Sequence, residues 1–384
     1  MTGRVVVNTD LNFVQGLMLH GAADLKKCYQ CSTCTVACPL TPNDEPFPRK
    51  EMLWAQWGMK DKLFRDMDLW LCHNCNDCTD QCPRGAKPGE VMSALRNQTI
   101  EHYSYPQAIS KAAKSARGNV VLFLIPMVLI ALAIAMKNIE SGFAFLTAKP
   151  IVYANMLTVN FIDILFLPPV LFAVFNSYKA ISNFIGGLKE QYPPTDRGEN
   201  LLPAVKGTIQ DVLSHIEFKK CGTNKSRNIS HRLMMYGFIG LFITTNAVFV
   251  LHWLNEFGFD VQVTPLPFFH PVKILGNVSA FAAFAGIYLI VRDRVKNSGT
   301  SILSLFDWMF IGNMFFTVVT GILCQVFRVG DHANLAFLTY YIHLVMVFYL
   351  LAYAPQTKFG HILYRPAAMI YSRYSGRNID IFRN

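Results

Sequence analysis

Eight of the ten cysteines fall in two short runs with identical spacing. Each run reads Cys-x2-Cys-x2-Cys-x3-Cys-Pro, a spacing that suits a pair of 4Fe-4S clusters. In this pattern the close triplet of one run binds three corners of a cluster, and the fourth cysteine reaches the other cluster. We therefore predict two 4Fe-4S clusters, one held by Cys28, Cys31, Cys34 and Cys82, and the other by Cys72, Cys75, Cys78 and Cys38.

Zinc is the alternative metal for such cysteines. Structural zinc sites use two pairs of ligands in a tetrahedral shell, and a doubled run of four that ends in proline fits this poorly. The 33 residues between Cys38 and Cys72 carry apolar residues at helical intervals, among them Met52, Leu53 and Trp57. An all-helical iron-sulfur domain is therefore expected.

Cys221 and Cys324 lie outside both runs, without the neighbouring base or thiol that a reactive cysteine needs. We expect Cys324 to be a small apolar residue in a membrane span. His73 and His102 are predicted to be surface or hydrogen-bonding residues, because four cysteines are available for each cluster.

Four histidines lie inside or beside apolar segments, where an imidazole is costly without a partner. His231 and His252 bound one segment, whereas His343 lies early in the last segment and His361 follows it. If these segments are antiparallel, His231 is level with His361, and His252 with His343. Their separations within each segment, 21 and 18 residues, correspond to about 31 and 27 Å of helix. This favours two bis-histidine haem b sites.

A single haem is the alternative, with His231 and His252 as interfacial residues. His270, in a loop after two prolines, is a second candidate for the ligand role of His252. The remaining histidines are predicted to be ordinary polar residues: His20, His215 and His332.

The chain is 52% hydrophobic and only 16% charged, too apolar to be soluble throughout. We predict an all-α protein with a cytoplasmic domain over residues 1-118 and a transmembrane helical bundle over 119-384. Six segments approach the roughly 20 residues needed to cross a bilayer. They are approximately 119-136, 158-181, 231-254, 273-292, 307-327 and 335-354.

Lysine and arginine are concentrated in alternate loops between these segments, which predicts an orientation with both termini cytoplasmic. The first 21 residues contain no basic stretch followed by an apolar one, so we expect no secretory signal. The net charge of +10 is therefore interpreted as membrane orientation, not as nucleic-acid binding. The predicted location is the inner (cytoplasmic) membrane, with lipid around the helices.

Three segments resemble known families. The stretch from His343 to His361 resembles the last helix of the cytochrome b subunit of respiratory nitrate reductases, where two histidines at this spacing bind two haems. The segment His231-RLMMYGFIGLF resembles the membrane cytochromes of heterodisulfide reductases, and the first hundred residues resemble their small iron-sulfur subunit, an alpha-helical ferredoxin. The fusion of both parts is similar to the C-subunit family of the quinone-interacting membrane-bound oxidoreductase (Qmo) complexes of sulfate-reducing bacteria.

The resemblance implies a membrane subunit that links the menaquinone pool to adenylylsulfate (APS) reductase through soluble flavin and iron-sulfur partner subunits. One departure concerns the early helix, where the nitrate reductase pattern has a second histidine and this chain has Leu241. Two alternatives stay open. A disulfide reductase module needs cysteine-rich motifs with adjacent cysteines, which are absent here, and a purely structural anchor leaves the four histidines unexplained.

Overall fold

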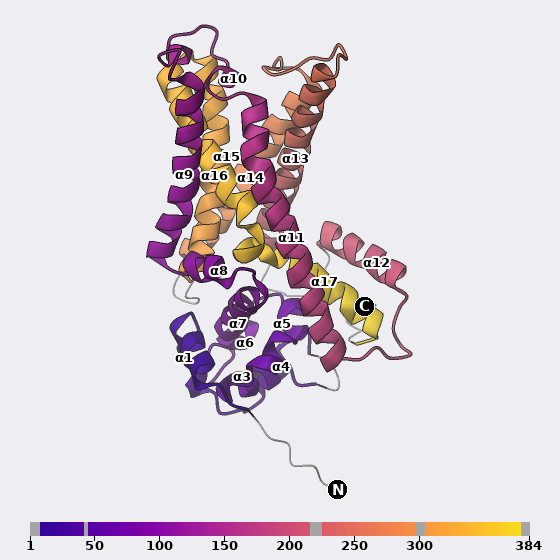
Figure 1. Ribbon diagram of the computed structural model, residues 1–384. Helices are drawn as coiled ribbons and strands as arrows, with labels where there is room; N and C mark the ends of the chain where they lie inside the picture. The colour runs from indigo at the N-terminus through magenta and orange to yellow at the C-terminus, as the bar shows by residue number, and fades with distance from the viewer. Residues whose placement is uncertain (1–7, 42–44, 216–224, 297–303, 378–384) are drawn as a thin grey trace.

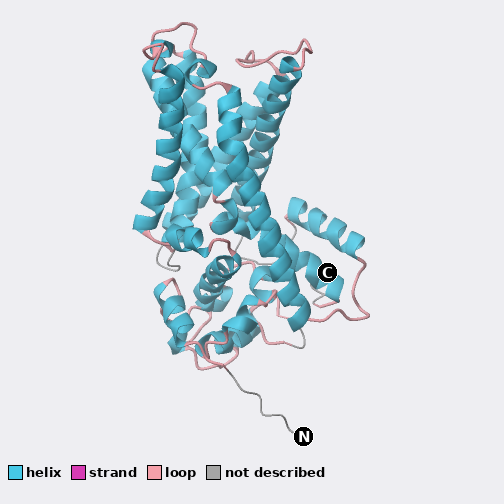
Figure 2. Ribbon diagram, in the orientation of Figure 1, coloured by secondary structure: helices cyan, strands magenta, loops and turns pink. Residues whose placement is uncertain are grey.

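The computed structural model describes residues 8–41, 45–215, 225–296 and 304–377 (Figure 1). Within these ranges the chain consists of helices and loops, and no β-strand occurs there (Figure 2). This confirms the prediction of an all-α protein. Cys221 lies outside the described ranges.

Short helices form the N-terminal part of the protein, and most of them pack around α7. Asp10 caps the first helix, because its Oδ1 accepts a hydrogen bond of 3.0 Å from the amide of Phe13. Pro88 opens α7, where its missing N–H has no cost. The helices are α1 (Leu11–Leu19), α2 (Thr33–Ala37), α3 (Arg49–Gln56), α4 (Lys60–Phe64), α5 (Asp68–Leu71), α6 (Asp77–Asp80), α7 (Pro88–Tyr103) and α8 (Gln107–Ala113).

Among the described residues, six helices are long and apolar enough to cross a membrane, in agreement with the six predicted segments. The side chains of Ser115 and Ser304 cap the first and fifth of them. Many large apolar side chains on these helices are exposed, as expected for surfaces that face lipid. The six are α9 (Ala116–Asn138), α11 (Val159–Gln191), α13 (Lys225–Glu256), α14 (Pro271–Lys296), α15 (Leu305–Val329) and α16 (Ala333–Ala352).

The polar insertion after α11 contains α12 (Leu201–Ser214), and the C-terminal helix α17 (His361–Ser375) packs along α12. A short helix, α10 (Tyr153–Met156), lies at the far end of the bundle from the N-terminal part (Figure 1). Because α16 and α17 are joined by two single 3-10 turns, Ala354–Gln356 and Lys358–Gly360, the chain changes direction sharply between them.

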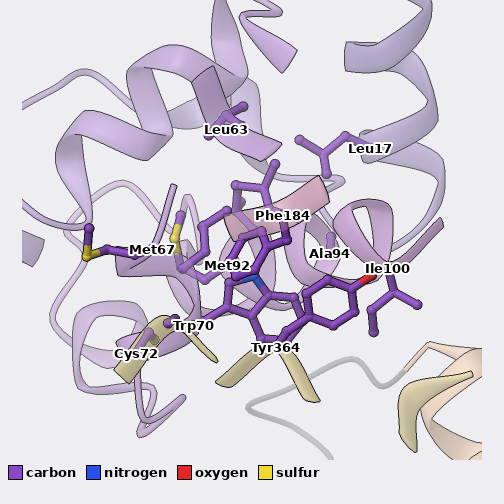
Figure 3. Packing of buried hydrophobic residues seen from close by; sticks show 14 of the residues in the cluster. Leu17, Leu63, Met67, Trp70, Cys72, Met92, Ala94, Ile100, Phe184 and Tyr364 are labelled. Carbon is purple, nitrogen blue, oxygen red and sulfur yellow. The ribbon is translucent and has the colours of Figure 1, made fainter. Parts of the chain in front are cut away.

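One core joins the N-terminal part to the helical bundle (Figure 3). Trp70 of α5 stacks on Tyr364 of α17, with ring centroids 4.8 Å apart, and Phe184 of α11 packs edge-on against both rings. All three side chains are buried. The cysteine runs are therefore held at a fixed position relative to the long helices.

Candidate iron-sulfur and haem sites

The two cysteine runs adopt the same loop conformation. Gln30 and Asn74, the second residue after the first cysteine of each run, have φ of 60° and 53°. Ser32 and Asn76, directly after the second cysteine, have φ of 69° and 74°. Non-glycine residues seldom adopt this left-handed conformation. Its repetition at equivalent positions gives each triplet the same shape.

The structure brings the fourth cysteine of each run to the triplet of the other. The thiols close enough to interact electrostatically with Cys34 include Cys28, Cys31 and Cys82. Those around Cys78 include Cys72, Cys75 and Cys38. The fourth cysteine of each run thus lies near the triplet of the other run, and the assignment of these groups as cluster ligands remains a prediction. Cys34 is also among the neighbours of Cys78, so the two groups lie next to each other.

The spacing of the sulfurs bears on the choice between an iron-sulfur cluster and zinc. In the part of the chain that the structure describes, no three cysteine Sγ atoms lie within 4.8 Å of one another. The sulfurs of a tetrahedral zinc site lie about 3.8 Å apart, as follows from Zn–S bonds of about 2.3 Å. The described cysteines are thus not gathered as closely as a closed tetrahedral zinc site would hold them, which favours the larger 4Fe-4S cubane.

The surroundings of the thiols also fit a cluster. The amide of Asn74 donates to the Sγ of Cys72 (3.3 Å) and that of Ala86 to the Sγ of Cys82 (3.4 Å), the type of contact that stabilises sulfur ligands. Burial, together with the neighbouring thiolates, raises the pKa of Cys34 to about 11. A positive centre is needed to hold such thiols as thiolates at neutral pH.

The two groups differ in exposure. Each group contains one buried cysteine, Cys34 in the first and Cys72 in the second, and the first group also contains the exposed Cys31. The second group encloses a small cavity, which is also lined by Leu40, Phe47 and His73. His73 is buried, whereas His102 is exposed and stacks on Phe64 with ring centroids 4.3 Å apart.

Arginines connect the second cysteine group to the helical bundle. Arg96 of α7 and Arg365 of α17 each donate to the carbonyl oxygen of Cys72 over 3.3 Å. Arg227 of α13 donates to the carbonyl oxygen of Asn74 over 2.7 Å. Because Arg227 and Arg365 belong to α13 and α17, the second cysteine group is the one that faces the long helices. Positive charge beside a cluster favours its reduced, more negative form.

Two of the predicted haem ligands have one ring nitrogen fixed by the protein. The Nδ1 of His361 lies 2.7 Å from the carbonyl oxygen of Lys358, and the Nδ1 of His343 lies 3.1 Å from that of Thr317. A carbonyl can only accept, so Nδ1 carries the proton and Nε2 is the nitrogen that can bind iron. Burial lowers the pKa of His361 to about 4, which keeps the imidazole neutral, as a ligand must be.

His231 and His361 lie close enough to interact electrostatically, as the predicted pairing requires. A third histidine joins them, because the Nε2 of His215 lies 2.9 Å from the Nδ1 of His231. Sequence reasoning missed this role and classed His215 as an ordinary polar residue. It ends α12 and reaches His231 only through the folding of the polar insertion, so no local pattern indicates the contact.

The distal pair of histidines is arranged differently. The Nε2 of His252 lies 3.1 Å from the Oδ1 of Asn160 on α11, whereas His343 is held by α15. His270, the alternative to His252, accepts a bond from the amide of Val272 (3.3 Å). The structure thus directs His252 and His343 toward different helices. The predicted pairing of these two residues remains a prediction.

Comparison with known proteins agrees with this geometry. Residues 24–86 match the family model of the 4Fe-4S dicluster domain. The chain carries a 4Fe-4S dicluster domain. Both cysteine groups lie within the matched range.

Among the proteins similar to this chain are subunits of heterodisulfide reductases. The E subunit of the dihydromethanophenazine:CoB–CoM heterodisulfide reductase of Methanosarcina acetivorans is 22% identical over 176 residues, which are 44% of this chain and 66% of that protein. The C subunit of the H2:CoB–CoM heterodisulfide,ferredoxin reductase of Methanothermobacter marburgensis is 34% identical over 94 residues, 24% of this chain and 51% of that protein.

A protein of Archaeoglobus profundus that is itself described as similar to the C subunit of heterodisulfide reductase is 34% identical over 117 residues, 27% of this chain and 62% of that protein. The chain thus spans less than two thirds of the length of these relatives. No solved structure matches the chain. The prediction of an iron-sulfur protein related to heterodisulfide reductases is confirmed.

Proposed function

We propose that this chain transfers electrons between a quinone in the membrane and a soluble protein partner, by way of haem b and two 4Fe-4S clusters. The observation that carries the proposal is the position of Arg365. Its guanidinium donates to the carbonyl oxygen of Cys72, and it lies one helical turn beyond His361 on α17. The candidate haem site and the second cysteine group are therefore adjacent.

The order of the sites supports a path from membrane to surface. His231 and His361 lie where α13 and α17 meet the N-terminal part, and Arg227 and Arg365 separate them from the second cysteine group. The first cysteine group follows and includes the exposed Cys31. A soluble partner has access to this end of the series.

In this proposal, the eight cysteines hold the clusters, His231 and His361 hold one haem b, and His343 with His252 holds a second. Bound clusters and haem supply one-electron chemistry. The chain itself fixes the positions of these groups, packs Cys72 into the core that contains Trp70, and sets the local charge with its arginines.

The resemblance to the Qmo family supports menaquinol as the electron donor and soluble flavin and iron-sulfur subunits as the acceptors. In that setting the electrons continue toward APS reductase in sulfate respiration, and the iron-sulfur domain lies on the cytoplasmic side of the inner membrane. The sequence has no glycine-rich nucleotide fingerprint, which favours a flavin on the partner.

A second candidate is a membrane component of a heterodisulfide-reductase-like complex. The similarity to the C and E subunits of such enzymes favours it. The two candidates share the electron path and differ in the partner and in the membrane carrier, which in one relative is named as dihydromethanophenazine.

The test is single-turnover reduction of the purified chain in lipid nanodiscs. Menaquinol is added anaerobically, haem absorbance and cluster electron paramagnetic resonance (EPR) are recorded, and the same sample is then treated with dithionite. Reduction of both haem and clusters by menaquinol supports the proposal. Clusters that dithionite reduces but menaquinol does not would overturn the quinone part, and absence of haem would overturn the path.

A further inference from the structure

A groove opens on the outside of the helical bundle between α9, α15 and α16. It has a volume of about 350 Å³, within the range of small-molecule sites. Its walls are almost entirely apolar or aromatic and include Phe123, Trp308, Phe316 and Val345. Trp308 and Phe316 are exposed on this face, 40% and 51%, so the groove is open toward lipid.

The groove lies in the half of the bundle nearer the iron-sulfur domain. Trp308 and Phe316 belong to the first half of α15, which begins at that end (Figure 1). Tyr341 limits the groove, because its hydroxyl donates to the carbonyl oxygen of Met127 (2.8 Å) and so joins α16 to α9. Since this bond closes the side of the groove between α16 and α9, a ligand in the groove would lie against α15.

Asn313 is one of the residues that line the groove, and its side chain is buried. It is only 3% exposed, and its Nδ2 has no hydrogen-bond partner, whereas its Oδ1 lies 3.1 Å from the hydroxyl of Thr317. An unsatisfied buried amide donor costs about 1–3 kcal/mol. A ligand that supplies a carbonyl oxygen at this point would remove that cost.

Asn313 and Met309 line both the groove and a smaller pocket next to it. Phe310 lines this inner pocket, and its ring centroid lies 6.0 Å from that of His361. On the other side, Thr317 joins Asn313 to His343, whose Nδ1 lies 3.1 Å from the carbonyl oxygen of Thr317. The unsatisfied donor thus lies between the lipid face and the candidate haem ligands.

We propose that this groove binds the ring of a lipid-soluble quinone, with a ring carbonyl accepting a hydrogen bond from the Nδ2 of Asn313 and the isoprenoid tail lying in the lipid. The proposal deepens the proposed function and rests on it, because it assigns the site of the membrane carrier. A phospholipid acyl chain is the competing occupant, and it has no carbonyl at the depth of Asn313.

Gly312 provides a direct test. It lines the groove, and a Cβ added there would meet no atom within 4 Å. The Cβ of Gly312→Leu is therefore free of clashes, its side chain is expected to occupy the groove, and leucine has a more favourable helix propensity than glycine. Gly186→Leu on α11, outside the groove, is the matched control, since a Cβ there also meets no atom within 4 Å. Asn313→Leu removes the donor, and Asn176→Leu removes another buried asparagine whose amide has no partner.

The experiment is a titration of the oxidised chain in phosphatidylcholine nanodiscs with the fluorescent quinone analogue heptyl-hydroxyquinoline N-oxide. We expect fluorescence quenching with wild type and both controls, none with Gly312→Leu, and about tenfold weaker binding with Asn313→Leu, the effect of one lost hydrogen bond. Quenching that is unchanged in Gly312→Leu would overturn the proposal. So would absence of quenching in wild type, the result expected if phospholipid fills the groove.

This titration requires no electron transfer, so it is independent of the test of the proposed function. Normal binding combined with clusters that menaquinol does not reduce would refute the electron path and leave the groove as a quinone site. Normal reduction by menaquinol in Gly312→Leu would refute the groove and leave the path.

Discussion

Arg365 donates to the carbonyl oxygen of Cys72 over 3.3 Å, although 293 residues separate them along the chain. This bond joins the helix that starts at His361 to the loop that starts the second cysteine group. A positive charge is thereby fixed between the candidate haem site and the cysteines that face it.

Arg365→Gln should lower the reduction potential of the second cluster. The guanidinium favours the reduced form, and loss of one positive charge at short range changes a potential by tens of millivolts, on the order expected from Coulomb's law at an effective dielectric constant of about 20. EPR-monitored redox titration measures it. Arg292→Gln is the control, because Arg292 is exposed and bonded to Asp293. Equal potentials in wild type and Arg365→Gln would contradict the role.

Cys82→Ser and Cys38→Ser should each damage the cluster of the opposite run. Cys82 lies with Cys28, Cys31 and Cys34, so its loss should remove the EPR signal that also disappears in triplet variants such as Cys31→Ser. Iron content should fall from about eight per chain to about four. Cys324→Ser, in α15, is the control and should keep all the iron. Loss of the same signal in Cys82→Ser and Cys75→Ser would disprove the crossed arrangement.

His361→Ala should remove one haem, because the Nδ1 contact with Lys358 aims the Nε2 of His361 at the proposed iron. His215→Ala should retain this haem with a shifted potential, since His215 contacts His231 and is not proposed as a ligand. Haem is quantified as the pyridine complex, and the potential is read by redox-titrated absorbance. If His215→Ala and not His231→Ala loses the haem, the ligand assignment is wrong.

The same measurement on His252→Ala decides the number of haems. Two haems in wild type and one in His252→Ala are expected from the two-pair scheme. His332→Ala, outside the apolar segments, is the control. A single haem that His252→Ala leaves intact would refute the distal site and confine the redox path to the side nearer the clusters.

Glu51→Gln should stabilise the protein more at pH 8 than at pH 5. Burial raises the pKa of Glu51, and the nearby Asp66 raises it further, although Lys50 Nζ lies 3.1 Å from its Oε1. A carboxyl whose folded pKa is raised contributes stability at low pH and loses it as pH rises, so a neutral isostere gains at high pH. We expect a rise of a few degrees in Tm at pH 8. A lower Tm at both values would show that Glu51 acts as a carboxylate.

Glu45→Gln is the matched control for this cluster. The pKa of Glu45 is lowered, because Arg377 and Lys50 outweigh the effect of burial. Its contribution to stability is therefore present above the unfolded pKa and is lost as the pH falls. Glu45→Gln should lower Tm at pH 8, the opposite sign to Glu51→Gln.

The sequence predicts the parts of this protein whose signals are local. Cysteine spacing within each run predicts two groups of four, a 4Fe-4S dicluster domain matches the range that holds both runs, and the length of each apolar segment predicts the six helices. The approach of His215 to His231 and of Arg227 to Asn74 has no such signal. These contacts depend on how the insertion and α13 dock onto the iron-sulfur domain, and each partner is an ordinary polar residue in its own segment.

The site in the groove shows the same limit. In the sequence, Asn313 is simply one polar residue in an apolar helix. Only the packing of α9 and α16 against α15 shows that its amide nitrogen lacks a hydrogen-bond acceptor. Nothing in the sequence around Gly312 indicates the open groove beside this residue either.

The ionic cluster at the base of the molecule links the two ends of the chain. Arg377, near the C-terminus, donates to both carboxylate oxygens of Glu45 and to Asp68 (2.6, 2.6 and 2.7 Å), and Tyr192 donates to Asp66 (2.8 Å). Synthesis proceeds from the N-terminus, so the iron-sulfur domain emerges first and its last contact emerges after all six long helices. This contact of the iron-sulfur domain is thus complete only once Arg377 has been made, and a truncation before Arg377 leaves Lys50 as the cation beside Glu45 and Asp68.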